Sequence, residues 1–196
     1  MTSKRASYLL SALKFLSRHG LIKAPPRPPP PSKLEKGQYF NKGVVYNEHN
    51  EVVSCLFCKI MEREQAGTIV YEDEDVVAFN TLAPSTSRHV LVCPRKHVAT
   101  VDSLSGPSGV RLVQSLVAVG KKCVGDEDAQ FSFHMPPWNS IDHLHLHAIG
   151  RRREMSWKAR LKFWEGSNDW CKSAAACIEE IESAPAGDNP APPRPS

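Results

Sequence analysis

The sequence lacks a long apolar run: no hydrophobic stretch approaches the roughly 18 residues that a membrane span needs. Aromatic residues make up only 8% of the 196 residues, and residues 1–34 carry seven Lys or Arg without a single Asp or Glu. Beyond that segment the charges nearly balance, and the formal net charge is only +4. We therefore expect one folded core of ordinary size, no membrane segment and no broad basic surface for duplex DNA.

Residues 1–53 are predicted to lie outside the folded domain. The first 23 residues are basic and acid-free, and four leucines between Leu9 and Leu16 share one helical face, which is typical of a mitochondrial transit peptide. A frayed basic terminus fits the same residues equally well, so the localisation stays open between mitochondria and cytoplasm. The stretch APPRPPPPSK then favours an extended spacer, because proline forbids helix and lacks a backbone donor.

The rest of the chain divides into a folded domain over residues 54–183 and a tail over 184–196, where Pro and Ala dominate and predict disorder. Helical periodicity predicts a helix that follows Ser108 as N-cap and stops at Gly125, and a last helical region over 157–181. Short β-branched or aromatic runs predict strands at 68–71, 76–80, 90–92 and 131–134. Helices beside one antiparallel sheet define an α+β fold.

The stretch HLHLHAI alternates three histidines with apolar residues. Strand side chains alternate between faces, so His143, His145 and His147 are expected to lie on one face of the sheet. A metal site that uses all three imidazoles is one interpretation. A site lined by the preceding loop is the other, because HMPPWNSID offers Asn139 and Ser140 as hydrogen-bonding groups beside the imidazoles.

Four segments in this order, CLFCKI, VVAFN, RHVLVCPRKH and FHMPPWNSIDHLHLH, resemble the histidine triad family and, within it, the Hint-type branch. The resemblance covers about Ser54 to Gly150. It implies a five-stranded antiparallel sheet with covering helices, an extra C-terminal helical region and a homodimer. It also implies an enzyme that binds purine nucleoside monophosphates and hydrolyses phosphoramidates such as AMP-NH2 or AMP-lysine, without a catalytic cofactor.

The same resemblance assigns roles to the site residues. His145 matches the nucleophile that forms a nucleotidyl-histidine, and the backbone carbonyl of His143 matches the acceptor that holds its ring. His147 and Ser140 match groups that hold the phosphate oxygens and assist the leaving group. The positions that match nucleotide contacts are Phe57, Phe79, Thr81, Leu82 and His134. At position 81 the family has an acid that binds the ribose hydroxyls, and a threonine hydroxyl forms weaker bonds than a carboxylate.

A structural zinc site is predicted at the pair Cys55 and Cys58. By resemblance to family members with this pair, His97 and His143 complete a tetrahedral set. Two buried free thiols are the alternative, because the six cysteines otherwise suggest reduced thiols rather than disulfides. His89 is expected to be a surface or edge residue.

Two other functions fit the sequence less well than the phosphoramidase. One is a zinc-stabilised regulatory protein that binds nucleotides with little turnover, which the missing acid at Thr81 favours. The other is an aprataxin-like hydrolase of adenylate on DNA ends, although no histidine follows His147 to build that protein's zinc finger.

Overall fold

The computed structural model describes residues 27–165 and 170–184. The predicted transit segment and all but the first residue of the predicted tail lie outside these ranges. Within them the strands are β1 (Tyr39–Asn41), β2 (Val44–Tyr46), β3 (Val52–Cys55), β4 (Ile69–Glu72), β5 (Val76–Asn80), β6 (His89–Pro94), β7 (Gln130–His134), β8 (Leu146–Ile149) and β9 (Cys171–Ser173). The helices are α2 (Leu56–Met61), α3 (Gly106–Val124), α4 (Trp157–Lys162) and α5 (Ala174–Ser183), with short 3-10 turns at Val101–Ser103 and Arg152–Glu154.

The main sheet has the strand order β4-β5-β6-β8-β7-β9, and every neighbouring pair is antiparallel. The predicted α+β class is confirmed, and all four predicted strands are present. The sheet has one strand more than the expected five, because β9 pairs with β7 and places Ser173 opposite Ser132. This extra strand comes from the C-terminal region.

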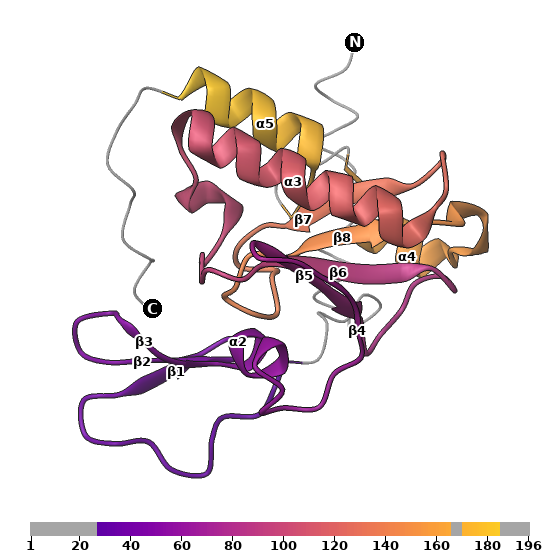
Figure 1. Ribbon diagram of the computed structural model, residues 1–196. Coiled ribbons are helices and arrows are strands. Elements are labelled where there is room, and N and C mark those ends of the chain that lie inside the picture. Colours follow the sequence, from indigo (N-terminus) through magenta and orange to yellow (C-terminus); the bar gives the residue numbers. More distant parts are fainter. Residues whose placement is uncertain (1–26, 166–169, 185–196) are drawn as a thin grey trace.

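One face of the main sheet is covered by α3 and α5, which lie side by side (Figure 1). The apolar stripe of α3, with Val113 and Leu116 fully buried, packs on inward side chains of the sheet such as Val92 and Leu146. Gly120 permits this close approach, since a Cβ there would lie 3.0 Å from the Cβ of Ala148.

The bounds of α3 differ from the prediction at one end only. The helix begins three residues earlier than expected, with Ser105 at the N-cap instead of Ser108. Pro107 lies in its first turn, where a missing N–H costs nothing, so the helix extends back through it. Gly125 ends the helix in the left-handed conformation with φ of 53°, as predicted.

The other face of the sheet carries α2 and a three-stranded sheet of order β1-β2-β3 (Figure 1). Regular structure therefore begins at Tyr39, inside the segment that was expected to be spacer up to residue 53. Val44 and Tyr46 of β2 are buried there. The β1–β2 turn uses Lys42 and Gly43 at positive φ, and Gly43 lies so close to Ile141 that a Cβ would clash with it.

The predicted C-terminal helical region over 157–181 is confirmed, but it is interrupted by a strand that the sequence did not predict. The structure has α4, then the strand β9, then α5. Pairing with the edge of β7 overrides helix propensity at Cys171–Ser173. Ser173 then begins α5, because its hydroxyl accepts a hydrogen bond from the backbone N–H of Ala176 at 3.1 Å.

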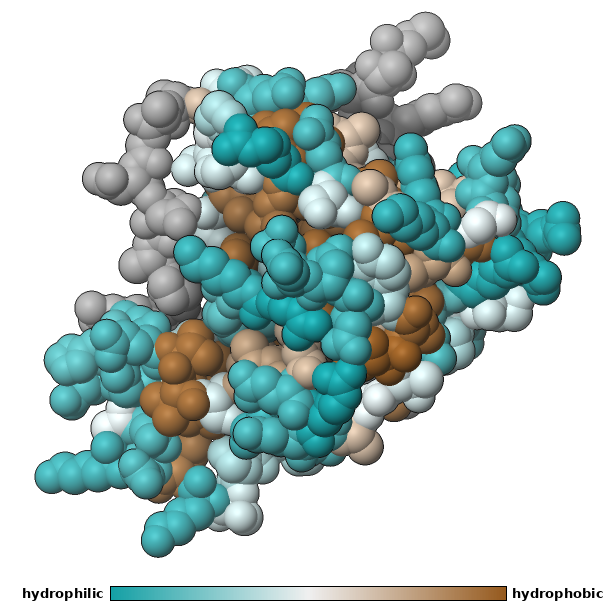
Figure 2. Space-filling model, in the orientation of Figure 1, coloured by the Kyte–Doolittle hydropathy of each residue, from teal (hydrophilic) through white to brown (hydrophobic). Residues whose placement is uncertain are grey.

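The surface seen in Figure 2 is mostly polar, with apolar patches between the charged side chains. One such patch lies at the lower left, over the corner of the molecule that holds β3, where Val52 and Val53 are 40% and 50% exposed. Among the helices in residues 27–165 and 170–184, none has the length and apolar character that crossing a bilayer requires.

Candidate active site and Cys/His cluster

The three alternating histidines are all buried on the sheet face opposite α3. Only His147 lies inside the strand, because β8 begins at Leu146. The preceding segment is fixed by backbone hydrogen bonds instead, from Leu144 N–H to the Val98 carbonyl at 2.6 Å and from Asp142 N–H to the Lys42 carbonyl at 2.9 Å. The predicted alternation of side chains therefore includes His143 and His145, which precede the first residue of β8.

The His145 ring is held by its own chain. Its Nδ1 lies 2.6 Å from the backbone carbonyl of His143. A carbonyl only accepts, so Nδ1 carries the hydrogen and Nε2 keeps a free lone pair. Burial lowers the pKa of His145 to about 4, although this hydrogen bond opposes the shift. At neutral pH the ring is an uncharged imidazole with an available nitrogen, which is the form required of a nucleophile.

His147 is oriented by His89. The backbone N–H of Ser85 donates to His89 Nδ1 at 3.1 Å, so the hydrogen of the neutral His89 ring is on Nε2. That nitrogen lies 3.0 Å from His147 Nδ1 and donates to it. His147 Nε2 must then carry a hydrogen, and in the described part of the chain this buried atom has no hydrogen-bond partner. His147 therefore presents a ready donor.

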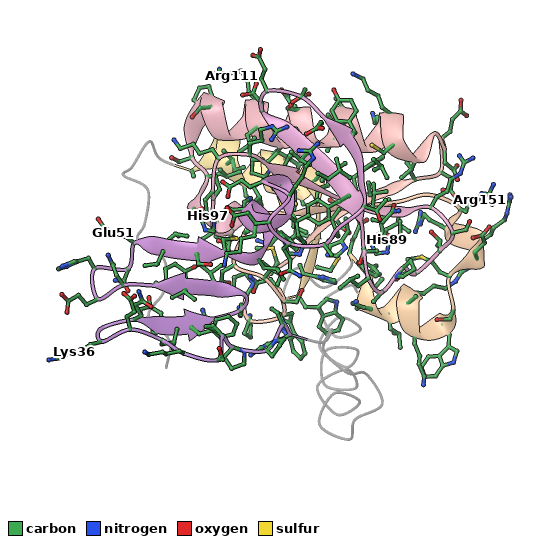
Figure 3. The ribbon with its side chains drawn as sticks, turned by 60° about the horizontal axis from the view of Figure 1, so that its bottom comes forward. Lys36, Glu51, His89, His97, Arg111 and Arg151 are labelled. Atoms are coloured by element: carbon green, nitrogen blue, oxygen red, sulfur yellow. The ribbon has the colours of Figure 1, made fainter. Side chains whose placement is uncertain are left out.

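The prediction that His89 lies at the surface is wrong, since this side chain is only 5% exposed. Burial lowers its pKa to about 3, with a smaller contribution from the positive charge of Lys162. The sequence carried no clear signal for its role, because the pairing of β6 with β8, which sets Leu91 opposite His147, brings the two histidines together. Figure 3 shows His89 on the side of the molecule that holds α4 and His97 nearer the three-stranded sheet.

His134 and Phe163 close the site beyond His147. The His134 ring stacks on Phe163 at a centroid distance of 4.9 Å and meets the edge of His147 at 4.5 Å. Burial lowers the pKa of His134 to about 3, so this ring is also neutral. Phe163 lies 5.0 Å from His147, and the sequence had given it only a packing role in the predicted C-terminal helical region.

Of the other predicted nucleotide contacts, Phe57 lies beside the triad and Phe79 packs against Phe57. Phe57 meets His145 edge-on at 5.3 Å and packs against Phe79 at 5.0 Å, and both rings are buried. Leu82 is fully exposed, and the Thr81 hydroxyl accepts from the N–H of Ala83 at 3.3 Å. Ser140 is half-buried and makes no side-chain hydrogen bond within the described residues.

A second group of side chains lies around His143. Its Nε2 donates to the carbonyl of Pro94 at 2.9 Å, so Nδ1 has the lone pair, and this atom is 3.4 Å from Cys55 Sγ and 3.6 Å from Cys58 Sγ. His97 Nδ1 is 3.7 Å from Cys58 Sγ. The four predicted ligands therefore come together, with all candidate ligand atoms within 4.8 Å of one another.

This set of four donors fits a tetrahedral metal ion. Bond lengths of about 2.3 Å to sulfur and 2.0 Å to nitrogen place neighbouring ligand atoms roughly 3.3–3.8 Å apart, as these contacts do. The bond to Pro94 fixes the tautomer of His143, as outer-shell partners of metal ligands do. A hydrogen bond from Cys58 lowers the pKa of Cys55 and raises that of Cys58, so Cys55 is the thiol that ionises first.

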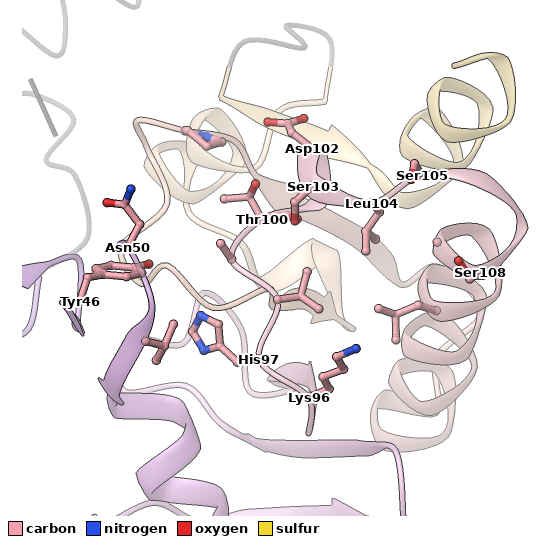
Figure 4. Close-up of a pocket in the computed structure, with 16 residues that line it drawn as sticks. Tyr46, Asn50, Lys96, His97, Thr100, Asp102, Ser103, Leu104, Ser105 and Ser108 are labelled. Carbon is pink, nitrogen blue, oxygen red and sulfur yellow. The ribbon is translucent and has the colours of Figure 1, made fainter. Parts of the chain in front are cut away.

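The cluster has one side facing a cavity. This cavity of about 630 Å³ is lined by His97 and Lys96, by Tyr46 of β2 and by the first turn of α3 (Figure 4). His145 and His147 are not part of its lining. Of the four cluster residues, only His97 lines this cavity.

Comparison with known proteins places this geometry in a family. The family model described as "Scavenger mRNA decapping enzyme C-term binding" matches residues 54–162. The adenosine 5'-monophosphoramidase HINT3 of Xenopus tropicalis is 30% identical over 147 residues, which cover 71% of this chain and 95% of that protein. The bifunctional adenosine 5'-phosphosulfate phosphorylase/adenylylsulfatase HINT4 of Arabidopsis thaliana is 36% identical over 111 residues, 54% of this chain and 76% of that protein.

Among solved structures, a HIT family hydrolase from Legionella pneumophila is 30% identical with a TM-score of 0.47, and the match covers 53% of this chain and 97% of that one. Fold and site together define a histidine triad protein. The chain belongs to the histidine triad family, in its Hint-type branch, and is similar to the HINT3 proteins.

Proposed function

We propose that this protein is a hydrolase that cleaves purine nucleoside phosphoramidates of the AMP-NH2 or AMP-lysine type through a nucleotidyl intermediate on His145. The observation that carries the proposal is the 2.6 Å hydrogen bond from His145 Nδ1 to the His143 carbonyl, which leaves a neutral ring with a free Nε2. Relatives named as adenosine 5'-monophosphoramidases support the same substrate class.

In the first step His145 Nε2 attacks the α-phosphorus, the phosphorus–nitrogen bond breaks and the amine leaves with its electron pair and a proton. The new imidazolium keeps its Nδ1–H on the His143 carbonyl, which favours the charged ring. Water then attacks the phosphorus, the bond to His145 breaks, and AMP and a proton are released. Two displacements at phosphorus thus replace one more difficult step.

His147 supplies the fixed donor. Its Nε2–H is already oriented by the chain from Ser85 through His89 and lacks a partner in the described structure. A donor that is in place before the reaction stabilises charge on the phosphate oxygens without reorganisation. Ser140, on the loop before the triad, is proposed to bind the same oxygens when substrate enters.

The nucleoside is proposed to lie at the Phe57 end of the site. Phe57 and Phe79 form an apolar wall next to His145, and aromatic faces suit a purine base. Thr81 and the exposed Leu82 directly follow the end of β5, next in sequence to Phe79 and Asn80. His134 contacts His147 and is proposed to face the phosphate. Thr81 is proposed to contact the ribose with a neutral hydroxyl in place of a carboxylate.

Turnover of AMP-NH2 by the full chain tests this function. Wild-type protein is expected to release AMP and ammonia, and His145→Ala is expected to lose at least about 1,000-fold in kcat/KM. Val53→Ala, on the exposed side of β3, serves as a control and should retain full turnover. Binding of AMP without turnover by the wild type would instead identify a regulatory nucleotide-binding protein.

We also propose that Cys55, Cys58, His97 and His143 hold a structural zinc ion. The contacts of 3.4–3.7 Å between sulfur and nitrogen atoms, and the oriented His143 ring, support this ligand set. With four protein ligands the ion would have no open position, so it would brace the segment next to His145 and take no part in the reaction.

A homodimer remains a prediction. In this chain β9 occupies the outer edge of β7, so the open edges of the main sheet within the described residues are those of β4 and β9. These edges and the apolar surface around Val52 and Val53 are the surfaces that we propose for a partner. Light scattering checks the state, with twice the 21.8 kDa of one chain expected for the dimer.

A further inference from the structure

The β1–β2 turn contacts residues 139–142, the Ser140 loop, which leads into the triad. The turn lies before residues 54–162, the part of the chain that the family model matches. Within the turn, the backbone carbonyl of Lys42 accepts a hydrogen bond from the N–H of Asp142 at 2.9 Å. The loop is therefore bonded to a segment that lies outside the matched domain.

Two side chains next to each other in the sequence reach the loop on both sides of Ser140. Lys42 Nζ donates to the side-chain oxygen of Asn139 and forms an ion pair with one carboxylate oxygen of Asp142 at 3.7 Å. Asn41 Nδ2 donates to the other carboxylate oxygen of Asp142 at 2.6 Å. Asn139 and Asp142 are only 3% and 8% exposed, so water competes little for these groups. Satisfied polar contacts in such a buried place hold the backbone that carries them.

Packing fixes the loop residue that follows Ser140. Gly43 lies against Ile141, and a Cβ at position 43 would lie 2.7 Å from Ile141 Cδ1. The carbonyl of Gly43 accepts a hydrogen bond from the N–H of Leu56 at 3.0 Å, where α2 begins. The turn thus connects the Ser140 loop with the helix that carries Phe57, so it contacts both sides of the proposed nucleotide site.

We propose that the β1–β2 turn positions the Ser140 loop for the reaction, with Asn41 and Lys42 holding the loop so that the Ser140 hydroxyl meets the phosphate oxygens. This inference rests on the proposed function, in which Ser140 binds those oxygens. Ser140 makes no side-chain hydrogen bond within residues 27–165 and 170–184, so its neighbours determine where it lies. A donor that is held in place before the reaction stabilises developing charge without reorganisation. Asn41 and Lys42 are positioning residues, because they act through the loop.

Turnover of AMP-NH2 in four full-length proteins tests this role: wild type, Lys42→Met, Lys42→Arg and Lys36→Met. Lys42→Met is expected to lower kcat about tenfold and to change KM less than about twofold, because the loop matters most in the transition state. Lys42→Arg keeps a cationic donor and should recover most of the loss. Lys36 is exposed, and the same substitution there should have no effect. A wild-type kcat in Lys42→Met would overturn the proposal.

A double-mutant cycle separates positioning of Ser140 from a general effect on the fold. If Lys42 acts through Ser140, Lys42→Met should lower kcat less than about twofold when Ser140 is already alanine. Asn41→Ala removes the other side-chain contact and should show the same dependence. Losses that multiply in both pairs, or full turnover in Ser140→Ala alone, would overturn the proposal.

Hydrogen–deuterium exchange measures the contact without turnover. Peptides that contain residues 139–142 should exchange at least about fivefold faster in Lys42→Met than in Lys36→Met, while those of α3 stay unchanged. Equal exchange in the two variants would mean that the side chain does not hold the loop. If the wild type fails to hydrolyse AMP-NH2, the proposed function fails, and exchange still decides whether the turn holds the loop. Turnover that requires His145 but not Lys42 would remove the positioning role alone.

Discussion

The stretch from His143 to His147 divides its imidazoles between two regions with opposite chemistry. His143 faces two thiols and another histidine, and its free Nδ1 points at sulfur. His145 and His147 face aromatic rings and other imidazoles, and each keeps an Nε2 that no group in the described structure engages. A shift of two residues along the chain therefore separates the proposed metal ligand His143 from the proposed nucleophile His145.

The three rings differ in the group that contacts their other nitrogen. His143 gives its Nε2–H to Pro94, His145 gives its Nδ1–H to a backbone carbonyl, and His147 accepts from His89. Each contact fixes which nitrogen carries the hydrogen and therefore which one is left for chemistry. Variants that remove these contacts in one region at a time should therefore have separable effects.

Removing a ligand of the Cys/His cluster should have the largest effect on stability. In Cys58→Ser the zinc content is expected to fall from one per chain to near zero, and the thermal midpoint by about 10 °C, because several kcal/mol of binding free energy are lost. Elemental analysis and calorimetry measure both. Cys123→Ser, a half-buried thiol outside the cluster, is the matched control and should keep its zinc. Equal zinc in both variants rules the site out.

Removing the partner of His147 should affect turnover and leave the cluster intact. His89→Phe takes away the donor to His147 Nδ1, so the tautomer is no longer fixed, and kcat for AMP-NH2 is expected to fall about 100-fold with little change in KM. His89→Gln has an amide that can donate in its place and should recover part of the loss. If kcat falls equally in both variants, His89 contributes to turnover through packing and not through its hydrogen bond to His147.

The buried neutral histidines should make stability depend on pH. Burial lowers the pKa of His134 to about 3 in the folded protein, below the value near 6.5 of an unfolded chain. The unfolded state therefore takes up the proton first, and stability is lost as pH falls from about 6.5 toward 3. Between pH 7 and 5 this amounts to up to about 2 kcal/mol. Urea unfolding of His134→Phe should be less sensitive to pH than that of the wild type, and identical slopes would contradict this account.

The smallest effect is expected where the loop before the triad contacts the β1–β2 turn. Lys42 forms a 3.7 Å ion pair with Asp142 and also binds Asn139, and all three side chains are largely buried. Lys42→Met should lower the free energy of unfolding by about 1 kcal/mol, because Asp142 keeps its bonds from Asn41 and Asn139. The exposed Lys36→Met serves as control. A loss above about 3 kcal/mol would mean that the ion pair dominates the loop.

Much of the fold and of the site could be predicted from local pattern. Strand alternation placed the three triad histidines on one face, and the Cys55–Cys58 spacing with His97 and His143 predicted the cluster that the structure assembles. These features depend on short spacings and on a family motif, so one sequence suffices to find them.

The parts that escaped prediction depend on contacts between distant segments. The role of His89 requires the register of β6 against β8, and the strand β9 exists because Cys171–Ser173 finds the edge of β7. The three-stranded sheet from Tyr39 onward is stabilised by packing of Val44 and Tyr46 against the main domain. Its strands are short and follow a proline-rich stretch, so the local sequence does not predict this packing. In each case a contact between segments distant in the sequence determines the local structure.

The most direct test of the central claim is to trap the reaction intermediate. Wild-type protein that is quenched without acid during turnover of AMP-NH2 should carry one adenylyl group. Mass spectrometry should locate this group on the peptide that contains His145 and find none in His145→Ala. An adduct on any other residue, or steady turnover with no adduct on this ring at any quench time, would contradict the account.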